Sequence, residues 1–349
     1  MNQGRAIMNT KTYIEKLTEI GGVSSNETEI AQFLSKELSK VCDRIETDIS
    51  GNVYGFINCG NSNAKTILLE AHMDRIGLIV TELCKDGTVL FSEAGGIDER
   101  ILPYSEVEFL NVGEHIRGII LPGRNNGTSK EETLNYSELH IFTGMEYDEL
   151  KSKIKIGSKI LIDSVFTSLL GNEICSGALD NRAGVASIMK VLNDIDRDKL
   201  KYNIEVLFSV GEELGLHGAF TGAVKSSADA AFVVDVTHGM TPDTKNETGV
   251  FPLGCGAVIC RGPNLHYRYT KKLIALSEND SVPYRIEVAP NSSGTTAWAL
   301  QVSGGGIPSM LISIPLKYMH TNVEVISVED VETTAELIIK AVEGGMDID

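Results

Sequence analysis

Two adjacent carboxylates, Glu212 and Glu213, directly follow a long apolar segment of the chain. The segment 202–210 is rich in β-branched and aromatic residues, which predicts a buried strand that breaks at Gly211. Acids at the end of a core strand are costly to bury unless a cation or hydrogen-bond donors hold them. Because neighbouring residues of an extended chain point to different sides, the two acids should have different partners. We expect Glu213 to ligate a metal ion and Glu212 to remain free as a general base.

Other potential ligands also lie at the ends of apolar segments. His72 ends KTILLEAH, Asp235 lies in AAFVVDV, His320 ends ISIPLKYMH, and Asp180 precedes a helix predicted to begin near Ala183. Taken singly, each has an ordinary explanation as a core histidine, a helix cap or a solvated turn. Together they lie where an open α/β fold places its site, at the carboxyl ends of mostly parallel strands. This convergence favours a functional site.

The number and chemistry of these residues point to a pair of metal ions. Five side chains, two imidazoles and three carboxylates, are too many for one tetrahedral zinc but suit two ions that share a bridging carboxylate. The set comprises His72, Asp180, Glu213, Asp235 and His320. Imidazole with carboxylate favours zinc, with cobalt and manganese as alternatives. Asp74 follows His72 at i+2 and is expected to orient its imidazole, the alternative being a salt bridge to Arg75.

The elements that position these residues follow from periodicity. Residues 10–38 predict two amphipathic helices separated by Gly21 and Gly22, with Ser24, Ser25 or Asn26 as the cap of the second. From residue 77 to about 163 the pattern changes to short alternating segments between glycine and polar turns, which is typical of a small all-β unit. After residue 176 helices and strands alternate again.

The simplest architecture is an α/β fold with a mostly parallel central sheet flanked by helices and a small all-β domain inserted into it. We expect residues 1–74 and 164–349 to form the discontinuous catalytic domain and residues 75–163 the inserted, barrel-like domain. The polar stretch 123–136 is expected to be a loop of the inserted domain. The length of 349 residues agrees with more than one hydrophobic core.

Charge and composition restrict the partners. A net charge of -17 argues against nucleic acid and anionic membranes. No apolar run approaches the ~18 to 20 residues that span a bilayer, and the first ten residues lack the apolar core of a signal peptide. The six cysteines form no C-x-x-C pair, which favours reduced thiols. A cytoplasmic protein is therefore expected.

The motifs, taken together, resemble those of the two-zinc aminopeptidases that assemble into tetrahedral dodecamers. This family includes deblocking and glutamyl aminopeptidases and proteins named cellulase M. The resemblance runs in order from Tyr13 to Glu343. It rests on HMD and IG at 72–77, ALDNR at 178–182, EELGL and GA at 212–219, DV at 235–236 and YMH at 318–320.

The resemblance implies a role for each matching residue. It assigns His72 and Asp235 to one zinc ion, Glu213 and His320 to the other, and Asp180 to both as the bridge. Glu212 matches the general base. The inserted domain is implied to mediate assembly, up to a dodecamer, and to shape access to the site.

Removal of N-terminal residues from short peptides is the expected activity. Two cations lower the pKa of water, and Glu212 takes the water's proton and passes it to the leaving amine. The sequence departs from the family pattern at Arg75, His217 and Thr296, the first and last standing where acidic residues are usual. These changes are expected to alter substrate preference, and a cation at Arg75 would favour acidic N-terminal side chains.

Other functions were weighed against this one. A two-metal amidohydrolase that acts on N-acyl amino acids would use much the same ligands. A glycosidase is disfavoured, because its two carboxylates must face each other across a sugar at ~5 to 10 Å. A non-catalytic metal-binding assembly protein is the third alternative, which an intact Glu212 argues against. Metal identity, the preferred residue and oligomer size are not determined by the sequence, and Tyr267, Tyr269 and the segment 290–298 receive no role.

Overall fold

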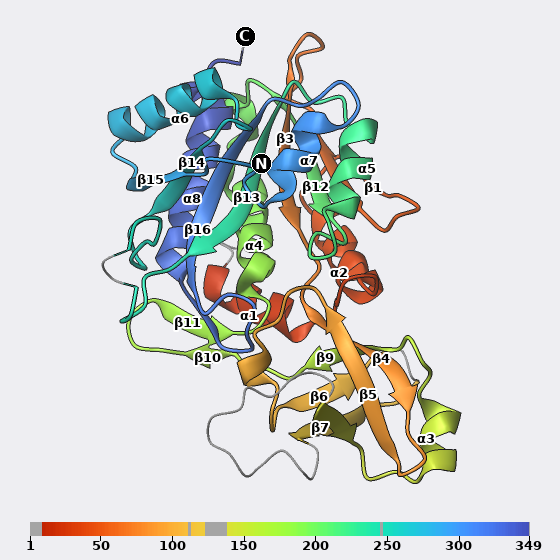
Figure 1. The fold of residues 1–349 in the computed structure, drawn as a ribbon. Coiled ribbons are helices and arrows are strands. Elements are labelled where there is room, and N and C mark those ends of the chain that lie inside the picture. The colour runs from red at the N-terminus through yellow and green to blue at the C-terminus, as the bar shows by residue number, and fades with distance from the viewer. Residues whose placement is uncertain (1–8, 111–112, 123–137, 245–246, 349) are drawn as a thin grey trace.

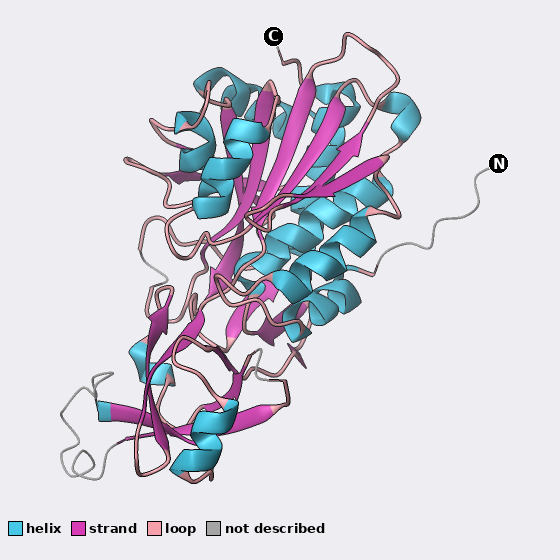
Figure 2. Ribbon diagram, turned by 90° about the vertical axis from the view of Figure 1, so that its right-hand side faces the viewer, coloured by secondary structure: helices cyan, strands magenta, loops and turns pink. Residues whose placement is uncertain are grey.

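The computed structural model describes the chain except residues 1–8, 111–112, 123–137, 245–246 and 349, so the expected loop at 123–136 lies outside the described residues. The described chain forms two units, an α/β unit built on a large twisted sheet and a smaller β unit below it (Figures 1 and 2). The β unit is formed by a continuous part of the chain, between two segments that both belong to the α/β unit.

The large sheet has eleven strands, and its four central strands are parallel. These are, in order across the sheet, β12 (Asn203–Ser209), β3 (Thr66–His72), β13 (Ala230–His238) and β16 (Ser309–Lys317). Antiparallel pairings extend the sheet on both sides. The outer strands are β1 (Arg44–Thr47), β2 (Val53–Ile57), β10 (Thr167–Ser168), β11 (Glu173–Ser176), β14 (Ala257–Arg261), β15 (Tyr284–Val288) and β17 (Glu324–Ser327). The expected parallel arrangement is thus found at the centre of the sheet.

Helices cover both faces of the sheet (Figures 1 and 2). Five pack into the larger hydrophobic core: α1 (Thr10–Glu19), α2 (Thr28–Leu38), α4 (Leu179–Asp194), α6 (Tyr267–Asn279) and α8 (Val328–Lys340). On the opposite face, α5 (His217–Lys225) and α7 (Thr296–Val302) enclose a smaller core. Short helical turns lie at Glu99–Ile101, Arg197–Lys199 and Ala341–Gly345. No helix among the described residues is long and apolar enough to cross a membrane.

The expected cap of α2 is wrong. Glu27 occupies the N-cap position, without a side-chain hydrogen bond to the helix. Its carboxylate instead accepts hydrogen bonds from the backbone N–H groups of Ser25 (2.9 Å) and Gly211 (3.1 Å). Ser24, one of the candidate caps, donates to Asp74 at 2.6 Å. The polar residues before α2 therefore hold the loop near the predicted site rather than the helix end.

Alternation along the central strands decides which side chains face which core. In β3, Ile67, Leu69 and Ala71 pack into the larger core, whereas Leu68 packs into the smaller one. Since side chains two residues apart share a face, His72 lies on the side of Leu68, above the smaller core. Asp235 takes the same side in β13, between Val234 and Val236 of the larger core. Both therefore emerge on the face covered by α5 and α7.

The β unit is a closed antiparallel barrel with the strand order β4-β5-β8-β7-β6-β9. Its strands are β4 (Gly77–Leu83), β5 (Thr88–Ala94), β6 (Glu106–Phe109), β7 (Ile116–Pro122), β8 (Leu139–Phe142) and β9 (Lys159–Ile162), with helix α3 (Tyr147–Lys153) beside them. It has a separate hydrophobic core, and closure leaves it without exposed strand edges. We propose domain boundaries at residues 75 and 163, which enclose all six strands.

Candidate active site

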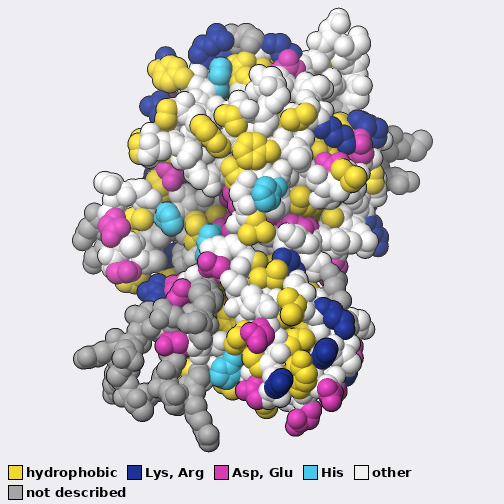
Figure 3. All heavy atoms as spheres, turned by 45° about the vertical axis from the view of Figure 1, so that its right-hand side comes forward, with side chains coloured by type: hydrophobic (Ala, Val, Ile, Leu, Met, Phe, Trp, Pro, Cys, Tyr) yellow, Lys and Arg dark blue, Asp and Glu magenta, His cyan; other side chains and the backbone are white. Residues whose placement is uncertain are grey.

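One pocket of about 520 Å³ collects the chemically active side chains. The residues that line it include His72 at the end of β3, Asp235 within β13, Glu212 and Glu213 after β12, His320 after β16, and Asp180 at the start of α4. In the space-filling view, histidine and acidic side chains gather at the middle of the molecule, between the α/β unit and the barrel (Figure 3). The structure therefore brings together all five predicted ligands and the predicted base.

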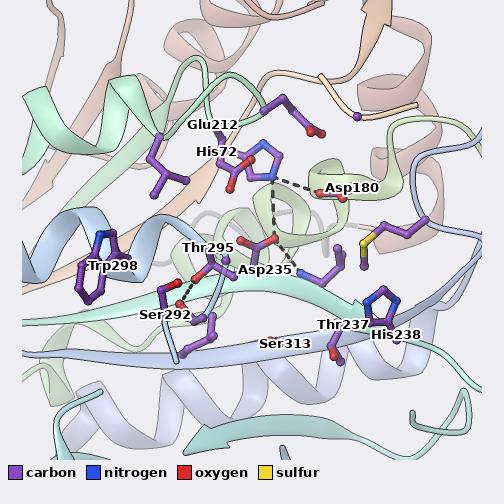
Figure 4. Close-up of a pocket in the computed structure, with 18 of the residues that line it drawn as sticks. His72, Asp180, Glu212, Asp235, Thr237, His238, Ser292, Thr295, Trp298 and Ser313 are labelled. Atoms are coloured by element: carbon purple, nitrogen blue, oxygen red, sulfur yellow. Dashed lines mark hydrogen bonds and ion pairs between the residues drawn. The ribbon is translucent and has the colours of Figure 1, made fainter. Parts of the chain in front are cut away.

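His72 lies at the centre of the group. Its Nε2 atom is 3.1 Å from Oδ1 of Asp180 and 3.8 Å from Oδ1 of Asp235 (Figure 4). The strands that carry His72 and Asp235 are parallel neighbours, so both side chains reach the same edge of the sheet.

Asp180 spans the site. Its Oδ1 faces His72, while its Oδ2 lies 3.4 Å from Nε2 of His320. The backbone at Asp180 departs from helical geometry, and Ala178 before it has a φ of +62°. This irregular start of α4 turns the carboxylate into the pocket, in the position expected for a bridging ligand.

The six side chains fall into two groups of three. Within each group, the potential ligand atoms all lie within 4.8 Å of one another. One group comprises His72, Glu212 and Asp235, and the other comprises Asp180, Glu213 and His320. Glu212, expected to remain free of metal, lies as close to His72 and Asp235 as a ligand would. Proximity alone therefore does not distinguish the base from the ligands.

The residues present fit a pair of divalent cations. Carboxylate oxygens and imidazole nitrogens are the donor set that zinc, cobalt and manganese accept. Oε2 of Glu213 lies 3.5 Å from Nε2 of His320, but Oε1 of Glu213 is buried and has no hydrogen-bond partner in the described part of the chain. A buried carboxylate oxygen without a donor is costly, and a cation between the facing ligands would satisfy it.

The pKa values of these side chains reflect the same excess of buried negative charge in the pocket. Burial and then repulsion from Asp180 raise the pKa of Glu213 well above its usual value, and burial does the same for Asp235. Burial raises the pKa of Glu212 to about 7. Burial opposes protonation of His72, but the carboxylates of Glu212, Asp180 and Asp74 raise its pKa well above normal. The raised pKa values of Glu213, Asp235 and His72 mean that protons would compete with cations for these atoms.

Asp74 holds both sides of the site. Its Oδ1 lies 3.4 Å from Nδ1 of His72 and accepts the backbone N–H of Glu212 at 3.0 Å. Its Oδ2 accepts the N–H of Glu213 at 3.3 Å and the hydroxyl of Ser24. Its position agrees with the expected orientation of the imidazole; the ion pair described for Asp74 is with His72, not with Arg75.

Glu324, which the sequence analysis did not identify, holds the backbone of Asp180 and His320 as Asp74 holds that of Glu212 and Glu213. It is 1% exposed and accepts the backbone N–H of His320 at 2.9 Å and that of Asp180 at 3.2 Å. Burial raises its pKa to about 8. An acid four residues after His320, inside the otherwise apolar segment EVI, was the available signal.

The three departures from the family pattern lie outside the pocket lining. Arg75 is 3% exposed, and the carboxylates acting on it are those of Glu324, Asp163 and Glu213. Thr296 is 1% exposed and donates a hydrogen bond to Glu70, which also accepts from Ser209 at 2.6 Å. The guanidinium of Arg75 is buried and does not line the pocket, so the expected preference for acidic substrates stays a prediction without a direct contact behind it.

Part of the remaining pocket wall comes from residues to which the sequence assigned no chemistry. Thr237 and His238 follow Asp235 on β13, Glu287 comes from β15, and Trp298 from α7. Residues 292–295 complete this wall (Figure 4). Tyr267 and Tyr269 do not line this pocket.

Comparisons with known proteins identify the family to which the chain belongs. Residues 51–337 match the family described as M42 glutamyl aminopeptidase. The chain is 32% identical to an Acetivibrio thermocellus protein assigned as an aminopeptidase (94% of this chain, 97% of the relative). It is 26% identical to the lysyl aminopeptidase of Pyrococcus furiosus (93% and 94%).

Solved structures show the same fold. An aminopeptidase from the archaeon Desulfurococcus kamchatkensis superposes with a TM-score of 0.89 at 28% identity, covering 96% of this chain and 94% of the other. The TET1 peptidase of Pyrococcus horikoshii, described as assembling into a tetrahedron or a large octahedral shell, gives 0.84 at 26% identity, covering 96% and 99%.

Proposed function

Because the chain belongs to the M42 glutamyl aminopeptidase family, whose members are metal-dependent aminopeptidases, we propose that it removes N-terminal residues from short peptides with two zinc ions in the pocket. His72, Asp180 and Asp235 would hold one ion, and Asp180, Glu213 and His320 the other. The observation that carries this proposal is the placement of Asp180, whose two carboxylate oxygens face different histidines.

Two bound divalent cations supply Lewis acidity, which polarises the scissile carbonyl and lowers the pKa of water. The chain supplies the proton transfers. Glu212, with a pKa of about 7 set by burial, is suited to take a proton from the attacking water and return it to the leaving amine near neutral pH. Asp74 acts as a positioning residue, since it holds the His72 imidazole and the backbone of Glu212 and Glu213.

We also propose that the protein forms a large homo-oligomer, a dodecamer by analogy with a TET1 structure described as a dodecamer in the asymmetric unit, with the barrel contributing to assembly and access. The support is the close fold match to a peptidase described as a tetrahedral or octahedral shell. Light scattering of the purified protein would measure the assembled mass. A stable monomer at micromolar concentration would contradict this part of the proposal.

The function itself is tested by metal analysis of the purified protein coupled to an aminopeptidase assay. We expect two zinc ions per chain, activity on peptides with a free N-terminus, loss of activity after chelation and recovery on re-addition of zinc. Peptides with an acetylated N-terminus serve as the matched control and should remain intact. Preferred cleavage of the acylated substrates would instead favour an amidohydrolase.

A further inference from the structure

We propose that Glu287 forms a subsite that selects peptides with a basic first residue, lysine or arginine. This inference rests on the proposed aminopeptidase function and names the substrate class of the same pocket. It is an alternative to the expected acidic preference, which depended on Arg75, whose side chain is buried.

The charges of the pocket wall favour a basic substrate side chain over an acidic one. Beyond the six residues of the metal centre, the ionisable side chains that line the pocket are Glu287 and His238. No lysine or arginine lines it among the described residues. A carboxylate on a substrate would therefore meet no permanent cation of the protein there, and would be repelled by Glu287.

The position of Glu287 places its carboxylate near the proposed metal centre. Thr237 follows Asp235 by two residues on β13, so the two side chains share a face about 7 Å apart along the strand. The hydroxyl of Thr237 donates a hydrogen bond to Oε1 of Glu287 at 2.7 Å. The first residue of a substrate would lie beside the proposed metal centre, because its terminal amine would bind there and its scissile carbonyl would be attacked there. Its side chain is then within reach of the Glu287 carboxylate.

The surroundings of Glu287 leave its carboxylate able to accept further hydrogen bonds from a substrate. Among the residues that the structure describes, this half-buried carboxylate has one hydrogen-bond donor, Thr237, although a carboxylate can accept about four hydrogen bonds. Burial raises its pKa, opposed by Thr237 and by the nearby His238. A lysine or arginine side chain would supply the missing donors and positive charge, in a site with less solvent screening than an open surface.

The test compares chromogenic aminoacyl substrates with Lys, Arg, Leu, Ala, Glu and Asp at the first position. We expect kcat/KM for Lys and Arg to exceed that for Glu and Asp by about tenfold or more, as for a partly desolvated charge pair. The variant Glu287→Gln keeps the shape but removes the charge. It should lose about tenfold on Lys and Arg substrates, chiefly through KM, while Leu and Ala substrates are cleaved as before. The charge reversal Glu287→Lys should shift the preference toward Glu.

Glu19→Gln removes one charge from an exposed position on α1 and serves as the matched control; it should leave the substrate ratios unchanged. An equal loss on all substrates in Glu287→Gln, or an unchanged ratio, would overturn the subsite. Calorimetric binding of free lysine and of free glutamate to the zinc-loaded protein gives a readout without turnover. Lysine binding that depends on Glu287, with no substrate cleaved, would refute the aminopeptidase and leave the subsite standing.

Discussion

Oδ1 of Asp74 lies 3.4 Å from Nδ1 of His72, and the same carboxylate accepts the backbone N–H groups of Glu212 and Glu213. A single buried side chain thus connects His72, a proposed ligand, to the loop that carries the proposed base and a second proposed ligand. The position of the base relative to the metal centre therefore depends on Asp74.

Replacing Asp74 with Asn tests this connection. The amide keeps one acceptor oxygen, so it cannot serve the imidazole on one side and two backbone N–H groups on the other. We expect metal affinity and kcat each to fall about 10- to 100-fold, the usual effect of losing such a partner. Metal titration and steady-state kinetics measure both, with the exposed Asp86→Asn on the barrel as control. Wild-type values in both assays would contradict the role of Asp74.

Replacing Glu212 with Gln tests whether this residue acts as a base or as a metal ligand. We expect Glu212→Gln to lower kcat by about 10² to 10⁴, because it removes the proton acceptor, and to retain two metal ions per chain. Plasma emission analysis of the variant gives the stoichiometry. Loss of one ion would show that Glu212 is a ligand with His72 and Asp235, as their proximity also allows.

Replacing Glu324 with Gln should weaken metal binding more than it changes the stability of the fold. In Glu324→Gln one of the two backbone N–H groups, that of Asp180 or of His320, loses its acceptor. We expect metal affinity to fall about tenfold. The thermal midpoint of the metal-free protein should change little at neutral pH, since Glu324, with a pKa of about 8, is already mostly uncharged there. The exposed Glu336→Gln is the control, and an unchanged zinc dissociation constant in Glu324→Gln would argue against the prediction.

The contact between Thr296 and Glu70 predicts how the fold responds to the usual acidic residue at position 296. Thr296→Asp would place a second carboxylate against buried Glu70 and should lower the free energy of unfolding by about 3 kcal/mol or more. Adding Glu70→Gln should recover most of this loss, because the amide donates to the new carboxylate. Thr296→Val, which removes only the hydroxyl, should cost about 1–2 kcal/mol. Denaturant unfolding measures all three, and additive effects in the double variant would contradict the coupling.

Metal binding should depend on pH in a definite direction. The pKa values of Glu213, Asp235 and His72 are raised, which favours protonation of these proposed ligands when no cation is bound. Binding then releases protons, so affinity rises with pH and falls on acidification, by about tenfold per pH unit for each proton released. Calorimetry in buffers of different ionisation enthalpy counts the protons. Affinity that does not change between pH 6 and 8 would be inconsistent with these shifts.

Sequence by itself determined the chemistry and its approximate location. His72 and Asp235 end or interrupt apolar strands, and the parallel order of such strands brings their carboxyl ends to one edge. Asp74 could be assigned to His72 because residues two apart on an extended segment share a face. Strand periodicity and local spacing were sufficient for these inferences.

Tertiary structure alone decided what each side chain contacts across the fold. Arg75 and Thr296 were expected to affect the substrate, but both are buried among groups far from them in sequence, Glu324 for one and Glu70 for the other. Glu287 and Thr237 meet through strands 50 residues apart. Such contacts depend on strand register and packing between distant segments, which local periodicity does not encode.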